Sequence, residues 1–169
     1  MKKIIAILGI LAVAGCHDDR GYITYGNGHP IAAEADSPYI LESEYEMADL
    51  INLDRTLLGM NALILSPGIS DVARAHSIHM ALANFEGTVN PQGDGPADRA
   101  ALAGFYFSRY EENISAGASD PVEVFNNWMM LPAMHDNLHD PFMDRMGVGY
   151  EYDSLSTFGS YWTVDFLRD

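Results

Sequence analysis

A single cysteine, Cys16, is the feature that most constrains how this 169-residue chain can fold. A disulfide framework and a thiolate-rich zinc module each need several thiols, so neither architecture is open to this chain. It must instead fold by packing a hydrophobic core, and 48% of its residues are hydrophobic. This length and apolar fraction are typical of one globular domain and exclude a wholly disordered chain.

The position of Cys16 also carries information about export. Lys2 and Lys3 precede the apolar residues 4–15, a run too short to span a bilayer as a helix but typical of a secretory signal. The run ends in small residues directly before Cys16, and this arrangement resembles the lipoprotein box of bacteria. The resemblance implies that residues 1–15 are a signal peptide and that Cys16 becomes the lipid-bearing N-terminus of an exported protein at the cell envelope.

The charge of the chain limits its partners. The full chain has 9 basic and 24 acidic side chains, a net charge of −15. Removal of residues 1–15 takes away Lys2 and Lys3, which leaves 7 basic and 24 acidic side chains, a net charge of −17. Nucleic acid is excluded as a partner, because phosphate binding depends on Lys and Arg. An acidic domain is repelled by anionic headgroups, so we expect the lipid on Cys16 to make the membrane contact. His17 follows the cysteine in place of Asp, which favours the outer membrane if the organism is Gram-negative.

The remaining chain divides into a tether and one domain. Residues 16–41 mix Gly, Pro, Asp and Tyr without a helical period, and we interpret them as a lipidated, flexible tether. Residues 42–169 form the predicted domain. Apolar periodicity and end signals predict its helices, with His76 on the buried stripe of the second and His79 at the margin. These helices cover residues 42–58, 66–83, 94–104 and 120–131.

The end of the chain has the pattern of paired strands. Apolar positions alternate over residues 146–152, residues 161–167 are rich in β-formers, and residues 153–159 join them as a turn. A short extended piece is also expected at residues 61–65. Helices early and a strand hairpin late predict an α+β domain in which helices cover a small antiparallel sheet.

A series of short words in the sequence resembles a known family, the bacterial CAP-domain proteins. CAP stands for cysteine-rich secretory proteins, antigen 5 and plant pathogenesis-related proteins. The resemblance covers about residues 46–166 and implies an α-β-α sandwich. The words, in order, are Glu46 to Asn52, Asp54-Arg55, Ala73 to Ser77, Asn90 to Gly93, Asp98-Arg99, Glu112-Asn113-Ile114, Trp128, His135-Asp136-Asn137 and Gly147-Val148-Gly149.

The same resemblance implies a central cavity. In the family, two histidines and two acidic residues line it, and in several members they hold a divalent metal. The second histidine corresponds to His135 and one acid to Glu112, whereas Thr88 and Leu131 stand where the other two ligands would be. One imidazole and one carboxylate leave most of a coordination shell to water. We therefore expect no required cofactor and, at most, a weakly bound cation such as zinc or magnesium.

Several roles remain open for these side chains. Glu112 and His135 are also consistent with a buried ion pair that braces a helix against the sheet. His135 and His139 stand four residues apart, a spacing that places two imidazoles on one helix face as a metal pair. His79 is a further candidate donor, whereas we expect His76 to be a hydrogen-bonded core histidine.

Two classes of function remain. No Gly-x-Ser-x-Gly turn is present and the sole thiol is assigned to the anchor, although Ser77 or Ser115 could in principle approach His135. We expect a non-enzymatic module that binds a small apolar molecule, an envelope polymer or another protein. The alternative is an envelope hydrolase or divalent-metal-dependent enzyme with His135 as base and Glu112 as orienting residue.

Overall fold

The computed structural model describes residues 22–25, 29–32 and 40–169. The predicted signal peptide, the lipidation site Cys16 and part of the predicted tether lie outside the described residues. Within the tether, β1 (Tyr22–Tyr25) and β2 (His29–Ala32) pair as antiparallel strands. Among the described helices, none combines the length and apolar character needed to cross a membrane.

Five helices and a four-stranded sheet make up the domain. The sheet has the strand order β3-β5-β6-β4, and β5 and β6 form the predicted antiparallel hairpin. The helices are α1 (Glu42–Leu57), α2 (Pro67–Ala83), α3 (Pro96–Leu102), α4 (Pro121–Met129) and α5 (Pro132–Leu138). The strands are β3 (Ile64–Leu65), β4 (Arg109–Ala116), β5 (Arg145–Tyr152) and β6 (Ser160–Arg168).

Two details of the predicted sheet are wrong. The sheet is mixed rather than antiparallel, because the short β3 pairs with β5 in the parallel direction. The strand β4 was not predicted, since Glu111, Glu112 and Asn113 lie at its centre and such residues are depleted in strands. Its partner β6 holds it in an antiparallel register from Arg109 to Ala116. The α+β class itself is confirmed.

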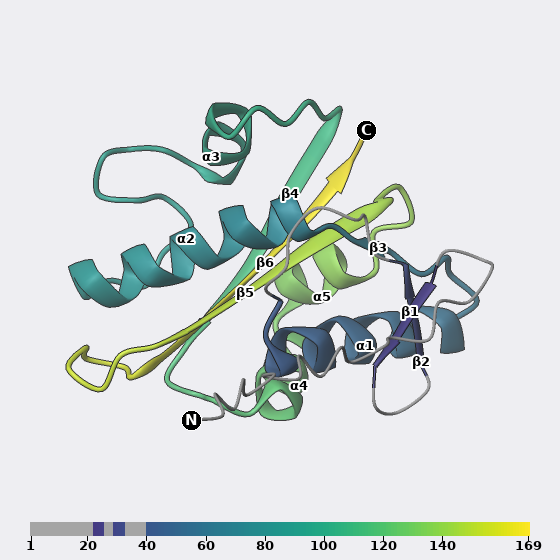
Figure 1. Cartoon of the computed structure of the whole chain (residues 1–169), viewed down its shortest axis with the longest axis horizontal. Helices are drawn as coiled ribbons and strands as arrows, with labels where there is room; N and C mark the ends of the chain where they lie inside the picture. Colours follow the sequence, from purple (N-terminus) through teal and green to yellow (C-terminus); the bar gives the residue numbers. More distant parts are fainter. Residues whose placement is uncertain (1–21, 26–28, 33–39) are drawn as a thin grey trace, which may run out of the picture.

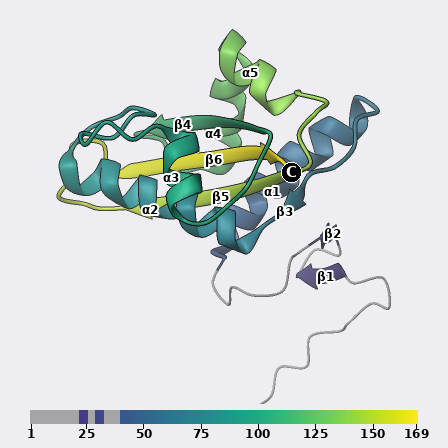
Figure 2. The same ribbon diagram turned by 90° about the horizontal axis from the view of Figure 1, so that it is seen from above.

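Helices cover both faces of the sheet, which gives the predicted α-β-α sandwich (Figures 1 and 2). Side chains alternate along β6, so each face receives every second residue. Trp162, Val164 and Phe166 join the main apolar core under α1, α4 and α5. The intervening Thr163 and Asp165 are buried on the opposite face, beneath α2 and α3. The face under α2 and α3 therefore carries the buried polar groups.

The helix α2 lies unusually close to β5 because two glycines face it. A Cβ atom at Gly147 would lie 2.3 Å from the carbonyl carbon of Ile69, and one at Gly149 would lie 2.1 Å from the backbone nitrogen of Arg74. The Ser77 hydroxyl donates to the carbonyl oxygen of Gly149 at 3.1 Å. The two glycines thus fix the height of α2, and with it His76, above the sheet.

Candidate functional site

A buried polar cluster lies between the sheet and the helices α2 and α3. Glu112 on β4 stands directly opposite Asp165 on β6, and the two residues are only 8% and 1% exposed. Tyr110 occurs two residues before Glu112 and so shares its face of β4. The Tyr110 hydroxyl, Glu112 Oε1 and both carboxyl oxygens of Asp165 are buried together in this cluster. Two carboxyl groups thus share one buried site.

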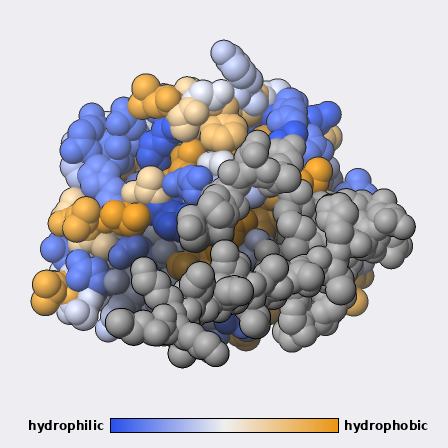
Figure 3. All heavy atoms as spheres, in the orientation of Figure 1, coloured by the Kyte–Doolittle hydropathy of each residue, from blue (hydrophilic) through white to orange (hydrophobic). Residues whose placement is uncertain are grey.

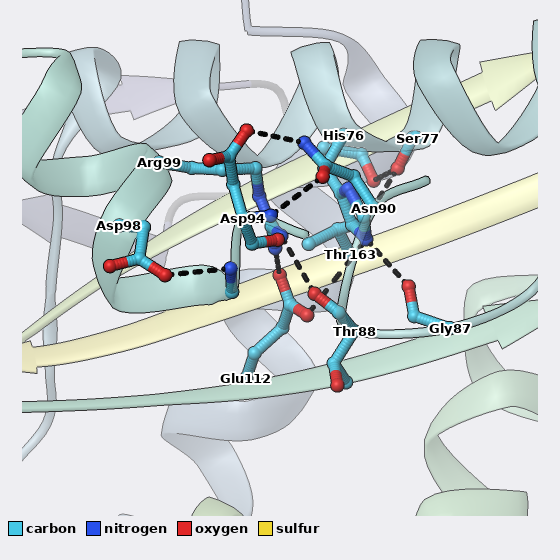
Figure 4. A network of polar contacts seen from close by, with 12 residues as sticks. His76, Ser77, Gly87, Thr88, Asn90, Asp94, Asp98, Arg99, Glu112 and Thr163 are labelled. Carbon is cyan, nitrogen blue, oxygen red and sulfur yellow. Dashed lines mark hydrogen bonds and ion pairs between the residues drawn. The ribbon is translucent and has the colours of Figure 1, made fainter. Parts of the chain in front are cut away.

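Arg99 on α3 supplies the positive charge of this cluster. Its Nη2 forms an ion pair with Glu112 Oε2, and its Nη1 donates to the carbonyl oxygens of Thr88 at 2.7 Å and Asp94 at 3.2 Å (Figure 4). The loop that presents these carbonyls is shaped by Asn90, whose Oδ1 accepts from the backbone nitrogens of Gln92 and Asp94. Arg99 is therefore fixed on several sides.

The charges of the cluster are unbalanced, because one guanidinium faces two carboxyl groups. Burial and the neighbouring carboxyl of Asp165 raise the pKa of Glu112 well above its ordinary value, and burial raises the pKa of Asp165 as well. Arg99 opposes both shifts without cancelling them. The cluster therefore favours the protonated form of a carboxyl group, because one guanidinium cannot offset two buried carboxylates.

His76 on α2 completes the cluster as a neutral imidazole. Burial and the charge of Arg99 lower its pKa to about 4. Its Nε2 lies 2.9 Å from the carbonyl oxygen of Gly87, which can only accept, so Nε2 carries the proton and donates. The same nitrogen is 4.0 Å from Glu112 Oε1. His76 is the hydrogen-bonded core histidine that the sequence predicts.

His135 does not join this cluster. It lies on α5, its side chain is 43% exposed, and its closest polar contact is Asp136 Oδ1 at 3.5 Å. The ion pair between Glu112 and His135, one of the alternatives left open by the sequence, is not formed, since Glu112 pairs with Arg99 instead. The reason is the pitch of α5, which turns Met134 toward the main core and its neighbour His135 outward.

The other candidate residues lie in separate surroundings. The ring of His139 packs on that of His135 with centroids 4.3 Å apart, and its Nε2 is 2.5 Å from Asp54 Oδ2 on α1. His79 packs edge-on against Phe85 at 5.5 Å. Leu131, at the start of α5, is half exposed. The structure therefore brings none of these side chains to Glu112.

The two candidate serines occupy structural positions. Ser77 is buried, its hydroxyl donates to the carbonyl oxygen of Gly149, and its Oγ lies 2.9 Å from Thr163 Oγ1, which can donate to it. Ser115 stands opposite Trp162 in the β4–β6 register, and three positions along β4 place it on the opposite face from Glu112. Neither arrangement resembles a serine activated by a histidine.

The cluster does not fit a metal ion. In the part of the chain that the structure describes, His, Cys, Asp and Glu form no group of three or more that is arranged to hold one. One carboxylate oxygen of Glu112 pairs with the guanidinium of Arg99. A metal ion bound to this oxygen would have to lie where the positively charged guanidinium already lies.

A groove of about 600 Å³ lies beside the cluster, between α2 and α3. One stripe of α2 and the end of α3 line it, with Arg99 and His76 at the boundary to the buried cluster. Figure 3 shows apolar side chains among hydrophilic ones over this part of the surface. The lining side chains that are small or apolar are Gly68, Val72, Ala75, Leu102, Ala103 and Phe105.

Sequence reasoning missed Arg99 and Asp165 as members of the site. Arg99 was recognised only as part of a family word, without a role. Asp165 had a detectable signal, because it is the one charged residue within the strand pattern of residues 161–167. A buried acid in such a strand requires a partner in the fold.

Comparisons with known proteins agree with this architecture. The family model described as the cysteine-rich secretory protein family, CAP, matches residues 48–166. The uncharacterized protein YkwD of Bacillus subtilis is 30% identical over 124 residues, which are 73% of this chain and 46% of that protein. The chain thus spans less than half the length of this relative.

Solved structures give the same picture. An extracellular protein of Bacillus anthracis with an SCP domain superposes with a TM-score of 0.69 and 25% identity, over 79% of this chain and 45% of that chain. An outer surface protein of Borrelia burgdorferi has a TM-score of 0.70 and 19% identity, over 75% and 92% of the two chains. The second likeness concerns the fold alone.

Proposed function

Because the chain belongs to the cysteine-rich secretory protein (CAP) family, we propose that it is an exported, lipid-anchored module of the cell envelope that binds a partner rather than catalysing a reaction. Its relatives include proteins described as extracellular and as outer surface proteins, which supports a place outside the cytoplasm. The partner is an apolar small molecule, an envelope polymer or a protein.

The ion pair between Arg99 and Glu112 is the observation that favours binding over catalysis, because it occupies the carboxylate that acid–base chemistry would need. A general base must be free to accept a proton, and a general acid must reach its substrate. Glu112 is buried against Arg99, His76 is buried with its Nε2 proton donated to the carbonyl of Gly87, and His135 stands on another layer of the fold. The groups that would form an acid–base pair are apart, and those that are together stabilise the fold.

The lipid anchor rests on Cys16 and on the small residues before it. Several acyl chains on one residue suffice for stable anchoring, since each buried methylene contributes ~0.8 kcal/mol. The acidic domain would then stay clear of the membrane surface, at the end of its tether. If the organism is Gram-negative, His17 favours the outer membrane as the destination.

Metabolic labelling with a radioactive fatty acid tests the anchor. We expect label on the wild-type protein and none on the Cys16→Ser variant, because the thiol is the acylated group. A matched Ser37→Ala variant in the tether should keep the label. Equal labelling of the wild type and Cys16→Ser would refute the anchor.

Thermal unfolding with and without zinc separates binding from metal-dependent catalysis. A ligand that binds only the native state raises the midpoint, so a midpoint unchanged by micromolar zinc or magnesium is expected. A rise of several degrees that Glu112→Gln abolishes would restore the metal-dependent enzyme as the better function. A rise that His139→Ala abolishes would instead assign the metal to α5.

A further inference from the structure

Two exposed arginines lie against the same aromatic ring at one end of the sheet. Phe142, in the loop between α5 and β5, is 54% exposed. The guanidinium carbons of Arg109 and Arg168 lie 6.0 and 5.8 Å from the centroid of its ring. Arg109 begins β4, Arg168 ends β6, and the two stand opposite each other in the register of these strands. The fold therefore gathers two cations and one apolar ring in one place.

This grouping stands out in a chain with a net charge of −15. The described residues contain no lysine, and most of their arginines are held by acids or carbonyls of the fold. The arginines held in this way are Arg55, Arg74, Arg99 and Arg145, the last by Asp169. Arg168 forms no ion pair with any residue that the structure describes. Its guanidinium is therefore available to an anion from outside.

Phe142 and Arg109 separate two hollows of different character. The first has a volume of about 340 Å³, and no acidic side chain lines it. The second has a volume of about 320 Å³, and three acids line it beside Arg109, which pairs with two of them. One side of the ring thus favours a negative group and the other a positive group or an N–H donor. The lining of the first is Ser108, Arg109, Phe142 and Arg168, and the acids of the second are Glu111, Asp136 and Asp140.

A ligand that fits both hollows carries one negative group beside hydrogen-bond donors. One guanidinium without an ion pair offers one complementary charge, and a carboxylate matches its planar fork. A group with two negative charges would be repelled about twice as strongly by the acidic chain. On the other side of the ring, the carboxylates of Glu111 and Asp136 can accept from N–H groups. The end of a peptide chain combines a carboxylate with amide donors in this order.

We propose that the surface around Phe142 binds the free carboxyl end of a short peptide. The carboxylate pairs with Arg168, and the preceding residues cross Phe142 toward Glu111. The two volumes suit a chain end of a few residues. The inference rests on the proposed binding function and names the chemistry of the partner, a terminus of a protein or of a peptide in an envelope polymer.

Fluorescence anisotropy with the full lipid-anchored protein in phosphatidylcholine nanodiscs tests the proposal. The probe is the tripeptide glycyl-lysyl-alanine with an uncharged fluorophore on its amino end, and the matched probe has a C-terminal amide instead of the acid. We expect the acid to bind about tenfold more tightly, because only the acid pairs with Arg168. General attraction to an acidic protein would favour the amide, which carries one more positive charge. Equal affinities, or tighter binding of the amide, would overturn the proposal.

Two arginine variants remove the same charge from different places. Arg168→Gln should weaken binding of the acid about tenfold and abolish the preference over the amide. Arg20→Gln, in the tether, should change neither quantity. Because the Arg168 side chain is exposed, the midpoints of thermal unfolding should agree and so exclude a folding defect. Equal loss of binding in both variants would reveal a general effect of charge and overturn the proposal.

Further measurements separate this inference from the proposed function. Proteins end in L-residues, so tighter binding of the tripeptide that ends in D-alanine assigns the partner to an envelope polymer, and tighter binding of the L form assigns it to a protein. Cleavage of the probe, read by mass spectrometry, would overturn the non-enzymatic function, while the comparison of acid and amide still decides the inference. If Cys16 proves not to be acylated, the same titration is done on the protein in solution.

Discussion

The substitution Gly149→Ala tests the close approach on which the site depends. The new Cβ would lie 2.1 Å from the backbone nitrogen of Arg74 and 2.4 Å from the carbonyl carbon of Ala73. Because these are backbone atoms, no rotamer change can relieve the overlap. To restore even a tight contact of 3.0 Å, α2 must move away from β5 by about 1 Å.

The cost follows from what that movement disturbs. Overpacking in a close-packed interior costs ~1–3 kcal/mol, and each hydrogen bond lost adds ~1 kcal/mol. The bond from Ser77 to the carbonyl of Gly149 and the ion pair of Arg74 with Glu44 both cross the gap that would widen. We expect a loss of ~3 kcal/mol, which lowers the melting temperature of a chain this long by roughly 6–12 °C.

Gly87→Ala is the matched control for this change. A Cβ at Gly87 meets its nearest neighbour at 3.7 Å, an ordinary contact, and the carbonyl that receives His76 is kept. Its stability should change by less than ~1 kcal/mol. The measurement is urea unfolding followed by circular dichroism. If Gly149→Ala loses no more stability than Gly87→Ala, α2 does not pack on β5 as described.

Three further predictions concern the polar cluster and the sheet edge. Arg99→Met leaves Glu112 and Asp165 without a counter-charge and should cost ~3–5 kcal/mol in urea unfolding, and adding Glu112→Gln should restore most of the loss. Since the raised pKa values of Glu112 and Asp165 mean that the native state holds a proton that the unfolded chain releases, stability should fall as the pH rises toward those values. The lowered pKa of His76 has the opposite sign and acts as the pH falls from 6.5 to about 4, where it offsets the effect of the carboxyl groups, so the fall of the melting temperature with rising pH should be clearest above pH 6.5, and a flat profile there would refute the assignment. Trp128→Phe removes the bond from Nε1 to the carbonyl of Ile114 at the edge of β4 and should cost ~1–3 kcal/mol by calorimetry.

Local signals predicted much of the fold because they act over a few residues. The N-cap at Asp120, whose side chain accepts from the nitrogen of Val122, and the alternation of residues 146–152 needed no tertiary context. The strand β4 did need it. Its acids are tolerated because Glu112 is paired through Arg99, a residue that reaches it only after α3 has folded over the sheet. Propensity was overridden by a contact across 13 positions of sequence.

The candidate site also depends on contacts between residues far apart in the sequence, which local signals do not predict. Glu112 was found because a family word contains it, but its true partners Arg99 and Asp165 are set by the register of β4 with β6 and by the loop around Asn90. His135 was misplaced for a different reason. On a two-turn helix, one residue separates a side chain in the core from one in solvent, and only the packing of Met134 decides between them.

The motifs that carry the family resemblance contain residues whose hydrogen bonds and ion pairs stabilise the fold. Arg74 pairs with Glu44 on α1, Asn52 exchanges hydrogen bonds with the backbone of Leu63, and Asn137 donates to the carbonyl of Glu112 at the free edge of β4. Such residues hold the layers of the sandwich together. They say correspondingly little about a ligand.

The groove residues outside those motifs are not fixed by these contacts. His79, Leu102 and Phe105 line the groove, but they belong to none of the family motifs and take no part in the stabilising contacts just named. A change at Leu102, which is largely exposed, alters the rim of the groove without removing a core contact. The surface of the groove can thus change at exposed positions such as Leu102 while the fold is kept. Exchanging Leu102 for Asp should accordingly leave the melting temperature within ~2 °C of the wild type.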